Sequence, residues 1–242
     1  MPADVPTILA TSMGFNWTDR YDAQPGPVFA EAITLAGAPS RPKLCYVGTA
    51  GGDDERSRLL MYSAFAGSDV RVSHLALFPM PNIDDMRAHL LGQDVIWVGG
   101  GSVAGLLAMW ALHGVGDLLR EAWQAGVVLS GVSAGSICWH VGGTTDSFGP
   151  DLRPVTNGLA LLPYANGVHY DSEQQRRPLF HRLIADGTLP EGYATDDGVG
   201  LVYRGTEFVE AVSDEPGAKA FRVLRGADGT ATETVIEPRA LR

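Results

Sequence analysis

Ser133 is the central residue of a Gly-X-Ser-X-Gly motif at positions 131–135, and the motif follows an apolar run at 127–129. A buried strand that ends in a sharp turn with a serine at its apex is typical of a nucleophile elbow, which presents the hydroxyl group to a substrate. The two glycines let the backbone reverse and let a following helix pack closely. Because such motifs also arise by chance in a chain with 30 glycines, the chemistry depends on which groups surround the serine.

A second glycine cluster, at positions 99–101, also follows an apolar run and precedes a helical pattern. The carboxyl ends of neighbouring strands meet at one edge of an open α/β sheet, so we expect the two turns to lie side by side. The N–H groups of Gly101 and Ala134 would then stabilise one oxyanion, helped by the dipole of the helix that begins at Ala134. Two other interpretations stay open: an ordinary turn, or a nucleotide-binding turn, since the segment loosely matches the Rossmann fingerprint.

A serine needs an adjacent base to act as a nucleophile at neutral pH. Of the six histidines, His169 has the most suitable position, because it ends an apolar stretch and precedes a polar loop, where a parallel strand delivers a side chain to the sheet edge. A carboxylate that accepts from its Nδ1 would fix the imidazole tautomer. Asp197 and Asp146 are candidates for this acid, together with the aspartates at 151, 171 and 196. The alternative role for each is to bind the backbone of its own turn.

Short apolar runs alternate with helical patterns through the first half of the chain, which is typical of parallel βαβ units. Near-continuous apolar runs indicate strands that are buried on both faces. We therefore predict an α/β fold with a mainly parallel sheet flanked by helices on both faces. The predicted strands are 7–11, 43–48, 70–77, 94–98 and 127–129, and the predicted helices are 27–37, 53–66, 83–91, 103–113 and 117–125.

The second half of the chain has weaker patterns. Residues 146–163 are rich in Gly, Pro, Asp and Asn, so we predict a loop there, which is a candidate lid over the site. We predict a strand at 164–169, a helix at 172–184 capped by Ser172, a turn at 193–198 and a strand at 199–203. Alternation at 218–224 and 232–236 predicts a C-terminal antiparallel β hairpin. Because no linker or repeat interrupts the chain, we expect residues 1–242 to form a single domain.

The composition is that of an ordinary globular protein, with 45% hydrophobic and 19% charged residues over 242 positions. The net charge of −10 argues against binding to nucleic acid or to an anionic membrane, because both attract basic surfaces. We find no signal peptide and no apolar run as long as a membrane span. Cys45 and Cys138 lack a metal-type spacing, and two isolated thiols fit a reducing cytoplasm. We expect no metal and no cofactor.

The order of these motifs resembles the peptidase E and cyanophycinase family of serine peptidases. The resemblance rests on Val98-Gly99-Gly100-Gly101-Ser102 with Leu106-Leu107, the serine motif, the histidine strand and the Asp-Asp-Gly turn at 196–198, over about residues 44–203. It implies a fold similar to class I glutamine amidotransferases. It also implies Ser133 as nucleophile, His169 as base, Asp197 as the acid with Asp146 as the alternative, and Gly101 and Ala134 as oxyanion donors. The family usually has Glu as the acid, and Asn is common where Ser102 stands here.

The resemblance further implies hydrolysis of short peptides next to aspartate, so the expected partner is a small peptide substrate. A substrate carboxylate calls for a cation, and Arg176 and Arg177 follow His169 near the position of family arginines. Ser102 is a further expected substrate contact. However, residues 173 and 174 are Glu and Gln where another family arginine is expected, and a solvated helix face is the alternative explanation for the two arginines.

Other activities compete with this interpretation. A glutamine amidotransferase would carry a cysteine at the position of Ser133. A non-catalytic ligand-binding or sensing protein of the same fold would be expected to lose Ser133 or His169. A serine esterase of the α/β-hydrolase type has the order serine, acid, histidine, which fits this chain only if Asp146 is the acid. A homodimer is compatible with the sequence, which does not decide the oligomeric state.

Overall fold

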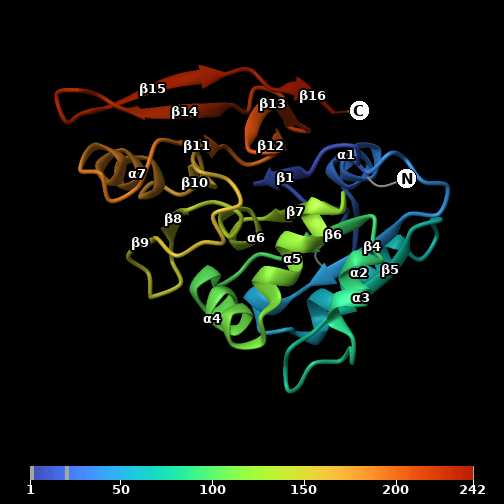
Figure 1. The fold of residues 1–242 in the computed structure, drawn as a ribbon. Coiled ribbons are helices and arrows are strands. Elements are labelled where there is room, and N and C mark those ends of the chain that lie inside the picture. The colour runs from blue at the N-terminus through green and yellow to red at the C-terminus, as the bar shows by residue number, and fades with distance from the viewer. Residues whose placement is uncertain (1–2, 20–21, 242) are drawn as a thin grey trace.

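The longest sheet in the part of the chain described by the computed structural model, residues 3–19 and 22–241, has eight strands (Figure 1). In spatial order these are β16 (Arg239–Ala240), β13 (Glu207–Ser213), β12 (Val199–Arg204), β1 (Thr7–Thr11), β7 (Val128–Val132), β6 (Val95–Val98), β4 (Lys43–Val47) and β5 (Arg71–Leu75). The strands from β1 to β5 in this order run parallel. β12 and β13 extend the sheet as antiparallel neighbours, and β16 pairs parallel with β13.

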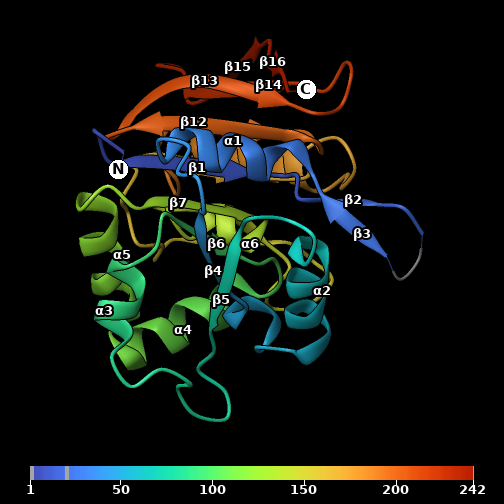
Figure 2. The ribbon, with the colours of Figure 1, turned by 90° about the vertical axis from the view of Figure 1, so that its right-hand side faces the viewer.

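Helices cover both faces of this sheet (Figure 2). α1 (Pro27–Leu35) and α2 (Glu55–Phe65) pack on one face, and α3 (Met86–Leu91), α4 (Val103–His113), α5 (Val115–Gln124) and α6 (Ala134–Ile137) pack on the other. Leu9 and Trp97 belong to the core on the α1 side, whereas Ile8 and Val98 belong to the core on the opposite side. Because both faces are covered, the strands are continuous apolar runs in the sequence. In the described ranges, no helix has the length and apolar character needed to cross a bilayer.

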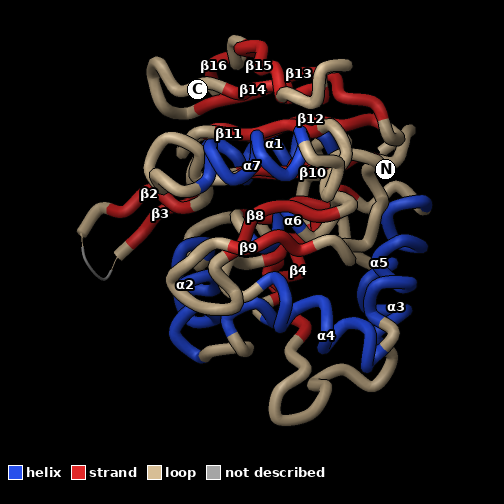
Figure 3. The backbone as a smooth tube through the Cα atoms, turned by 90° about the vertical axis from the view of Figure 1, so that its left-hand side faces the viewer, coloured by secondary structure: helices blue, strands red, loops and turns tan. Residues whose placement is uncertain are grey.

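A second sheet, with six strands among the described residues, packs against the first. Its order is β15 (Ala231–Ile236), β14 (Ala220–Arg225), β11 (Gly192–Thr195), β10 (Ala165–Gly167), β8 (Gly142–Thr145) and β9 (Arg153–Val155). β8, β10 and β11 are parallel. α7 (Arg176–Ala185) covers the outer face through Phe180 and Leu183 (Figure 3). On the inner face Tyr193 packs with Tyr203 of β12, so the two sheets share one core.

A short hairpin, formed by β2 (Phe15–Trp17) and β3 (Ala23–Pro25), follows β1 and lies beside α2 (Figure 2). Phe15 anchors its base against Phe29 of α1, with ring centroids 5.0 Å apart. Trp17 at the end of β2 is 56% exposed, although it is a large apolar side chain. A 3-10 turn, η1 (Thr49–Gly51), connects β4 to the α2 segment.

The predicted α/β fold, with a mainly parallel sheet between two layers of helices, is confirmed. The predicted C-terminal hairpin is confirmed as well, because β14 and β15 pair antiparallel. The second sheet was not predicted. Of its parallel strands only β10 lies within a predicted strand, 164–169. β8 and β11 are short and rich in Gly and Thr, so they show no apolar run.

Local predictions in the second half were wrong at three places. Segment 146–163 is not a loop throughout, because β9 pairs with β8 and buries Val155. The helix predicted from Ser172 begins at Arg176, because the N–H of Glu173 donates to the carbonyl of His169 and prolongs the preceding turn. The turn predicted at 193–198 begins as a strand, since residues 193–195 belong to β11 and only 196–198 link it to β12.

Gly135 allows α6 to pack directly on β6. A Cβ at this position would lie 2.2 Å from the carbonyl oxygen of Val98, which is strand backbone and cannot turn aside. We expect Gly135→Ala to lower the free energy of unfolding by about 1–3 kcal/mol, as overpacking typically does. The measurement is the urea midpoint at constant slope. Gly67→Ala is the matched control, because nothing lies within 4 Å of a Cβ there; an equal midpoint for both variants would contradict the prediction.

Candidate active site

Ser133 joins β7 to α6 at the carboxyl edge of the eight-stranded sheet. Its φ of 56° and ψ of −111° lie outside the regions that most residues adopt, which marks a sharp turn. The Ser133 N–H donates to the carbonyl of Thr11 on β1 at 3.0 Å, and its own carbonyl accepts from Ser136 and Ile137 at 2.8 and 2.9 Å. These bonds hold the backbone on both sides, while the side chain stays partly exposed.

The glycine turn after β6 lies directly beside Ser133. A Cβ on Gly100 would lie 3.4 Å from the Cβ of Ser133, and one on Gly101 would lie 2.3 Å from the carbonyl oxygen of Ala50. With its φ of 133°, Gly101 can pass this close to η1 only because it lacks a side chain. Among the described residues, the amides of Gly101 and Ala134 have no hydrogen-bond acceptor. Both are therefore available to bind an oxygen atom.

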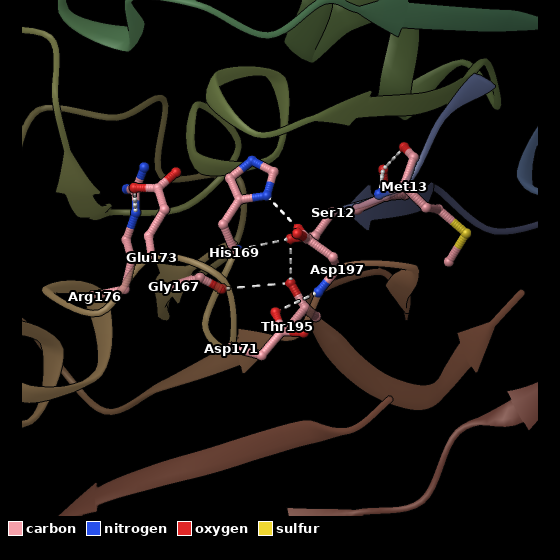
Figure 4. Close-up of polar contacts among 10 residues, drawn as sticks. Ser12, Met13, Gly167, His169, Asp171, Glu173, Arg176, Thr195 and Asp197 are labelled. Carbon is pink, nitrogen blue, oxygen red and sulfur yellow. Dashed lines mark hydrogen bonds and ion pairs between the residues drawn. The ribbon is translucent and has the colours of Figure 1, made fainter. Parts of the chain in front are cut away.

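His169 and Asp197 form a close pair (Figure 4). The Nδ1 atom of His169 lies 2.5 Å from Oδ1 of Asp197. An ionised carboxylate only accepts hydrogen bonds, so in the neutral imidazole Nδ1 carries the proton and Nε2 keeps its lone pair. The side chains are 22% and 46% exposed, respectively, so the imidazole is accessible to a substrate. This is the protonation pattern that a general base needs.

Asp197 lies on the link between the two sheets, after β11 and before β12. Its N–H donates to Oδ1 of Asp171 at 2.9 Å. The neighbouring Asp196 faces away: its N–H donates to the carbonyl of Lys219 at 3.0 Å, and its carboxylate accepts from the Lys219 N–H at 2.9 Å. Burial raises the pKa of Asp196. Asp196 thus binds the segment just before β14, whereas Asp197 contacts the imidazole of His169.

Ser12 connects the two halves of the site, and sequence reasoning missed it. Its hydroxyl oxygen accepts from the N–H of His169 at 3.3 Å and shares a hydrogen bond of 2.7 Å with the hydroxyl of Thr195 (Figure 4). Because Ser133 binds the carbonyl of Thr11, Ser133 and His169 are bonded to consecutive residues at the end of β1. The available signal was a polar residue immediately after a buried strand, at the carboxyl edge.

The structure places the other candidate acid elsewhere. Asp146 is exposed and lines a separate cavity of about 550 Å³ near the start of α7. His169 has Asp197, and not Asp146, within hydrogen-bond distance.

Ser102 caps α4, because its hydroxyl oxygen accepts from the N–H of Gly105 at 3.1 Å. Among the described residues, no group of three or more His, Cys, Asp or Glu side chains is placed to hold a metal ion.

The two arginines predicted to bind substrate have partners within the chain. Arg176 is buried and donates to a carboxylate oxygen of Glu173 at 2.9 Å (Figure 4). It also donates to the carbonyl of Thr144. Arg177 forms an ion pair with Glu233 of β15 and stacks over the rings of Tyr170, which follows β10, and Phe221 of β14. The sequence indicated two cations after the histidine, but not the acids that pair with them. Substrate binding by either arginine stays a prediction.

His140 lies beneath the serine turn, fully buried. Its Nδ1 bonds the carbonyl of Ser136 at 2.9 Å, and its Nε2 lies 3.4 Å from the hydroxyl of Tyr203. Burial lowers the pKa of His140 from 6.5 to about 4, although the bond to Ser136 opposes the shift. As the pH falls, this histidine is therefore protonated in the unfolded chain before it is protonated in the folded one. The contribution of neutral His140 to the free energy of unfolding is complete above about pH 6.5. It is lost as the pH falls toward 4, by up to about 3 kcal/mol.

We expect His140→Gln to flatten this pH dependence. The free energy of unfolding, measured by urea at pH 7.0 and in steps down to pH 4, should fall less steeply in the variant than in the unaltered protein. His113→Gln, at the end of α4, is the control and should keep the original slope. Identical slopes for all three proteins would contradict a role for His140.

Comparisons with known proteins match peptidases over most of the chain. The model of Peptidase family S51 matches residues 25–211. The chain is 42% identical over 184 residues to the "Uncharacterized peptidase YgaJ" of Bacillus subtilis, covering 76% of this chain and 79% of that one. It is 37% identical over 92 residues to "Peptidase E" of Shewanella denitrificans, covering 38% and 39% of the two chains.

Two solved structures share the fold. A peptidase from an acI-B1 Actinobacterium superposes with a TM-score of 0.65 at 16% identity, covering 96% of this chain and 95% of that one. A putative peptidase E from Listeria monocytogenes gives a TM-score of 0.59 at 17% identity, with 84% and 96% covered. The family match spans most of the chain and includes Ser133, His169 and Asp197. The chain therefore belongs to peptidase family S51.

Proposed function

We propose that this member of a peptidase family is a serine peptidase that hydrolyses short peptides, above all dipeptides with an N-terminal aspartate, through an acyl-enzyme on Ser133. The observation that carries the proposal is the His169–Asp197 pair, with Nδ1 and Oδ1 2.5 Å apart and Nε2 left as a base. Ser12 ties that pair to the end of β1, and Ser133 is bonded to the same strand end.

The proposed reaction begins when Nε2 of His169 accepts the proton of the Ser133 hydroxyl and Oγ attacks the scissile carbonyl. The N–H groups of Gly101 and Ala134 bind the oxyanion of the tetrahedral intermediate. The C–N bond then breaks, and His169 gives its proton to the leaving amine. Water, deprotonated by His169, hydrolyses the acyl-enzyme. Asp197 keeps the proton on Nδ1 and stabilises the imidazolium in both steps.

The aspartyl preference is supported by the family resemblance and by two arginines on the helix after His169. The guanidinium of Arg176 is bound by Glu173 and by the carbonyl of Thr144. A substrate carboxylate could take the place of the Glu173 carboxylate while the bond to Thr144 keeps the guanidinium in position. Arg177 would have to leave Glu233 and its aromatic neighbours. Arg176 is therefore the stronger candidate for recognition of the substrate aspartate. Ser102 keeps its proposed role as a substrate contact at the glycine turn.

The test is a substrate panel with purified protein: Asp-X and Glu-X dipeptides, neutral dipeptides, a β-aspartyl dipeptide and a simple ester. We expect Asp-X dipeptides to give the highest kcat/KM. Hydrolysis of the ester alone would favour an esterase. Binding of a peptide without turnover by a folded protein would favour a non-catalytic role. Faster hydrolysis of neutral dipeptides would leave a serine peptidase but remove the aspartyl preference.

A further inference from the structure

A cavity of about 570 Å³ opens next to the proposed catalytic residues, on the face of the sheet that carries α2. Gly100 and Val132, which flank Ser133, form part of its wall, and so does Asp197. The rest of the wall comes from β2 of the hairpin, α2, the ends of β4 and β6, and the segments that follow β1, β11 and β13. The reaction described above uses none of these wall residues except Asp197.

The wall of this cavity combines aromatic and other apolar side chains with the polar side chains of Ser12, Asn16 and Ser57. Four rings line it, and they come from Phe15, Trp17, Tyr46 and Trp97. Burial raises the pKa of Tyr46 to about 12, so its hydroxyl stays protonated and uncharged. Leu60 of α2 completes the apolar side. Aromatic walls of this kind bind bulky apolar groups by removing a large surface from water.

The charges on the wall exclude acidic groups. Asp197 and Asp214 are the charged residues among the described lining residues, which include no Lys and no Arg. Asp197 is bound to His169. A carboxylate entering the cavity would meet these two acids without a balancing cation. An uncharged bulky group meets no such penalty.

This inference rests on the proposed function, in which the acyl residue is aspartate. Because the wall repels the aspartate side chain, the cavity is left for the other residue of the peptide, the one released as the amine. We propose that the cavity between the β2–β3 hairpin and α2 is the subsite for the leaving-group residue, and that it selects bulky aromatic or aliphatic side chains.

Trp17 is the residue on which this selection depends most. It is 56% exposed in the absence of substrate and lines both this cavity and a neighbouring one between the hairpin and α2. Its ring therefore closes the outer side of the subsite, where a substrate side chain would cover it. An exposed tryptophan next to a proposed catalytic site is accounted for if a ligand buries it.

The experiment compares kcat/KM for Asp-Phe, Asp-Gly, Asp-Lys and Asp-Asp. Burial of a phenylalanine side chain predicts that Asp-Phe exceeds Asp-Gly by about 10–100-fold, and Asp-Asp should be the poorest substrate. Trp17→Ala should reduce the Phe-to-Gly ratio by about tenfold, and Leu60→Ala should reduce it less. Trp17→Phe, which keeps an aromatic ring, should retain most of the ratio. Leu112→Ala, at an exposed leucine of α4 on the opposite face, is the control and should keep it.

Each outcome separates this inference from the proposed function. Equal kcat/KM for Asp-Phe and Asp-Gly, or a ratio that Trp17→Ala does not change in a protein of unchanged urea midpoint, would overturn the subsite and leave the peptidase. Preference for Asp-Lys over Asp-Phe would also overturn it, because the acidic residues of the wall, and not its aromatic rings, would then select the leaving-group residue. Hydrolysis of none of the four dipeptides by folded protein would overturn the proposed function and the subsite with it.

Discussion

Replacing Ser133 by alanine is expected to lower kcat/KM for Asp-X dipeptides by at least about 10⁴-fold, because the acyl-enzyme cannot form without Oγ. The residual rate would come from the oxyanion donors Gly101 and Ala134 acting on a bound peptide. Among the described residues the Ser133 hydroxyl has no hydrogen-bond partner, so its loss should leave the urea midpoint nearly unchanged. Initial rates of dipeptide hydrolysis, followed by release of free amino acid, provide the measurement.

Ser172 gives the control for Ser133. Ser172 lies on the exposed turn between His169 and α7, and Ser172→Ala should keep wild-type kinetics. A fluorophosphonate inhibitor should add one adduct to the unaltered protein, on the peptide that carries Ser133, and none to Ser133→Ala. If Ser133→Ala retained more than about one-hundredth of the activity, free of contaminating peptidase, the acyl-enzyme mechanism would be wrong.

Asp197→Asn is expected to lower kcat by about 10³–10⁴-fold with a smaller change in KM. An asparagine amide can donate to Nδ1, which favours the imidazole tautomer with the proton on Nε2. Nε2 could then no longer accept the proton of the Ser133 hydroxyl. The steady-state parameters on Asp-X dipeptides give the measurement, and circular dichroism checks that the β11–β12 link keeps its fold.

Asp146→Asn is the matched control for Asp197→Asn, because the substitution is the same and Asp146 lies on the exposed segment after β8. We expect it to change kcat by less than about tenfold. A loss of about 10³-fold on Asp146→Asn, with little effect of Asp197→Asn, would reverse the assignment and restore the order serine, acid, histidine. Asp197→Glu then asks whether the site tolerates one more methylene group, as the usual acid of the family would require.

Three parts of the site were predictable because each follows an apolar run in the sequence. Ser133 and the glycine turn come after β7 and β6, whose apolar runs locate them on the sheet edge without further information. His169 was predictable because Val168 and its apolar neighbours precede it. Asp197 was indicated by the Asp-Asp-Gly turn together with the family resemblance, and the structure brings it to His169.

What was not predictable depends on contacts between segments far apart in the sequence. Arg176 is held by the carbonyl of Thr144, 32 positions earlier, and Arg177 by Glu233, 56 positions later. Neither pairing leaves a pattern along the chain, so the arginines looked free. Ser12 binds His169 across 157 positions and was missed for the same reason. The aromatic cavity likewise needs Trp17 and Leu60 together, which only the packing of the β2–β3 hairpin against α2 provides.

The proposed catalytic residues belong to different sheets, and this has a consequence for how the protein loses activity. Ser133 follows β7 of the eight-stranded sheet, and His169 follows β10 of the six-stranded one. Asp197 lies on the link between the two sheets, after β11 and before β12. A small displacement of one sheet relative to the other would separate Ser133 from His169, while both sheets keep their secondary structure. Activity therefore requires the two sheets to stay docked. We expect it to fall during mild heating before circular dichroism shows any loss of secondary structure.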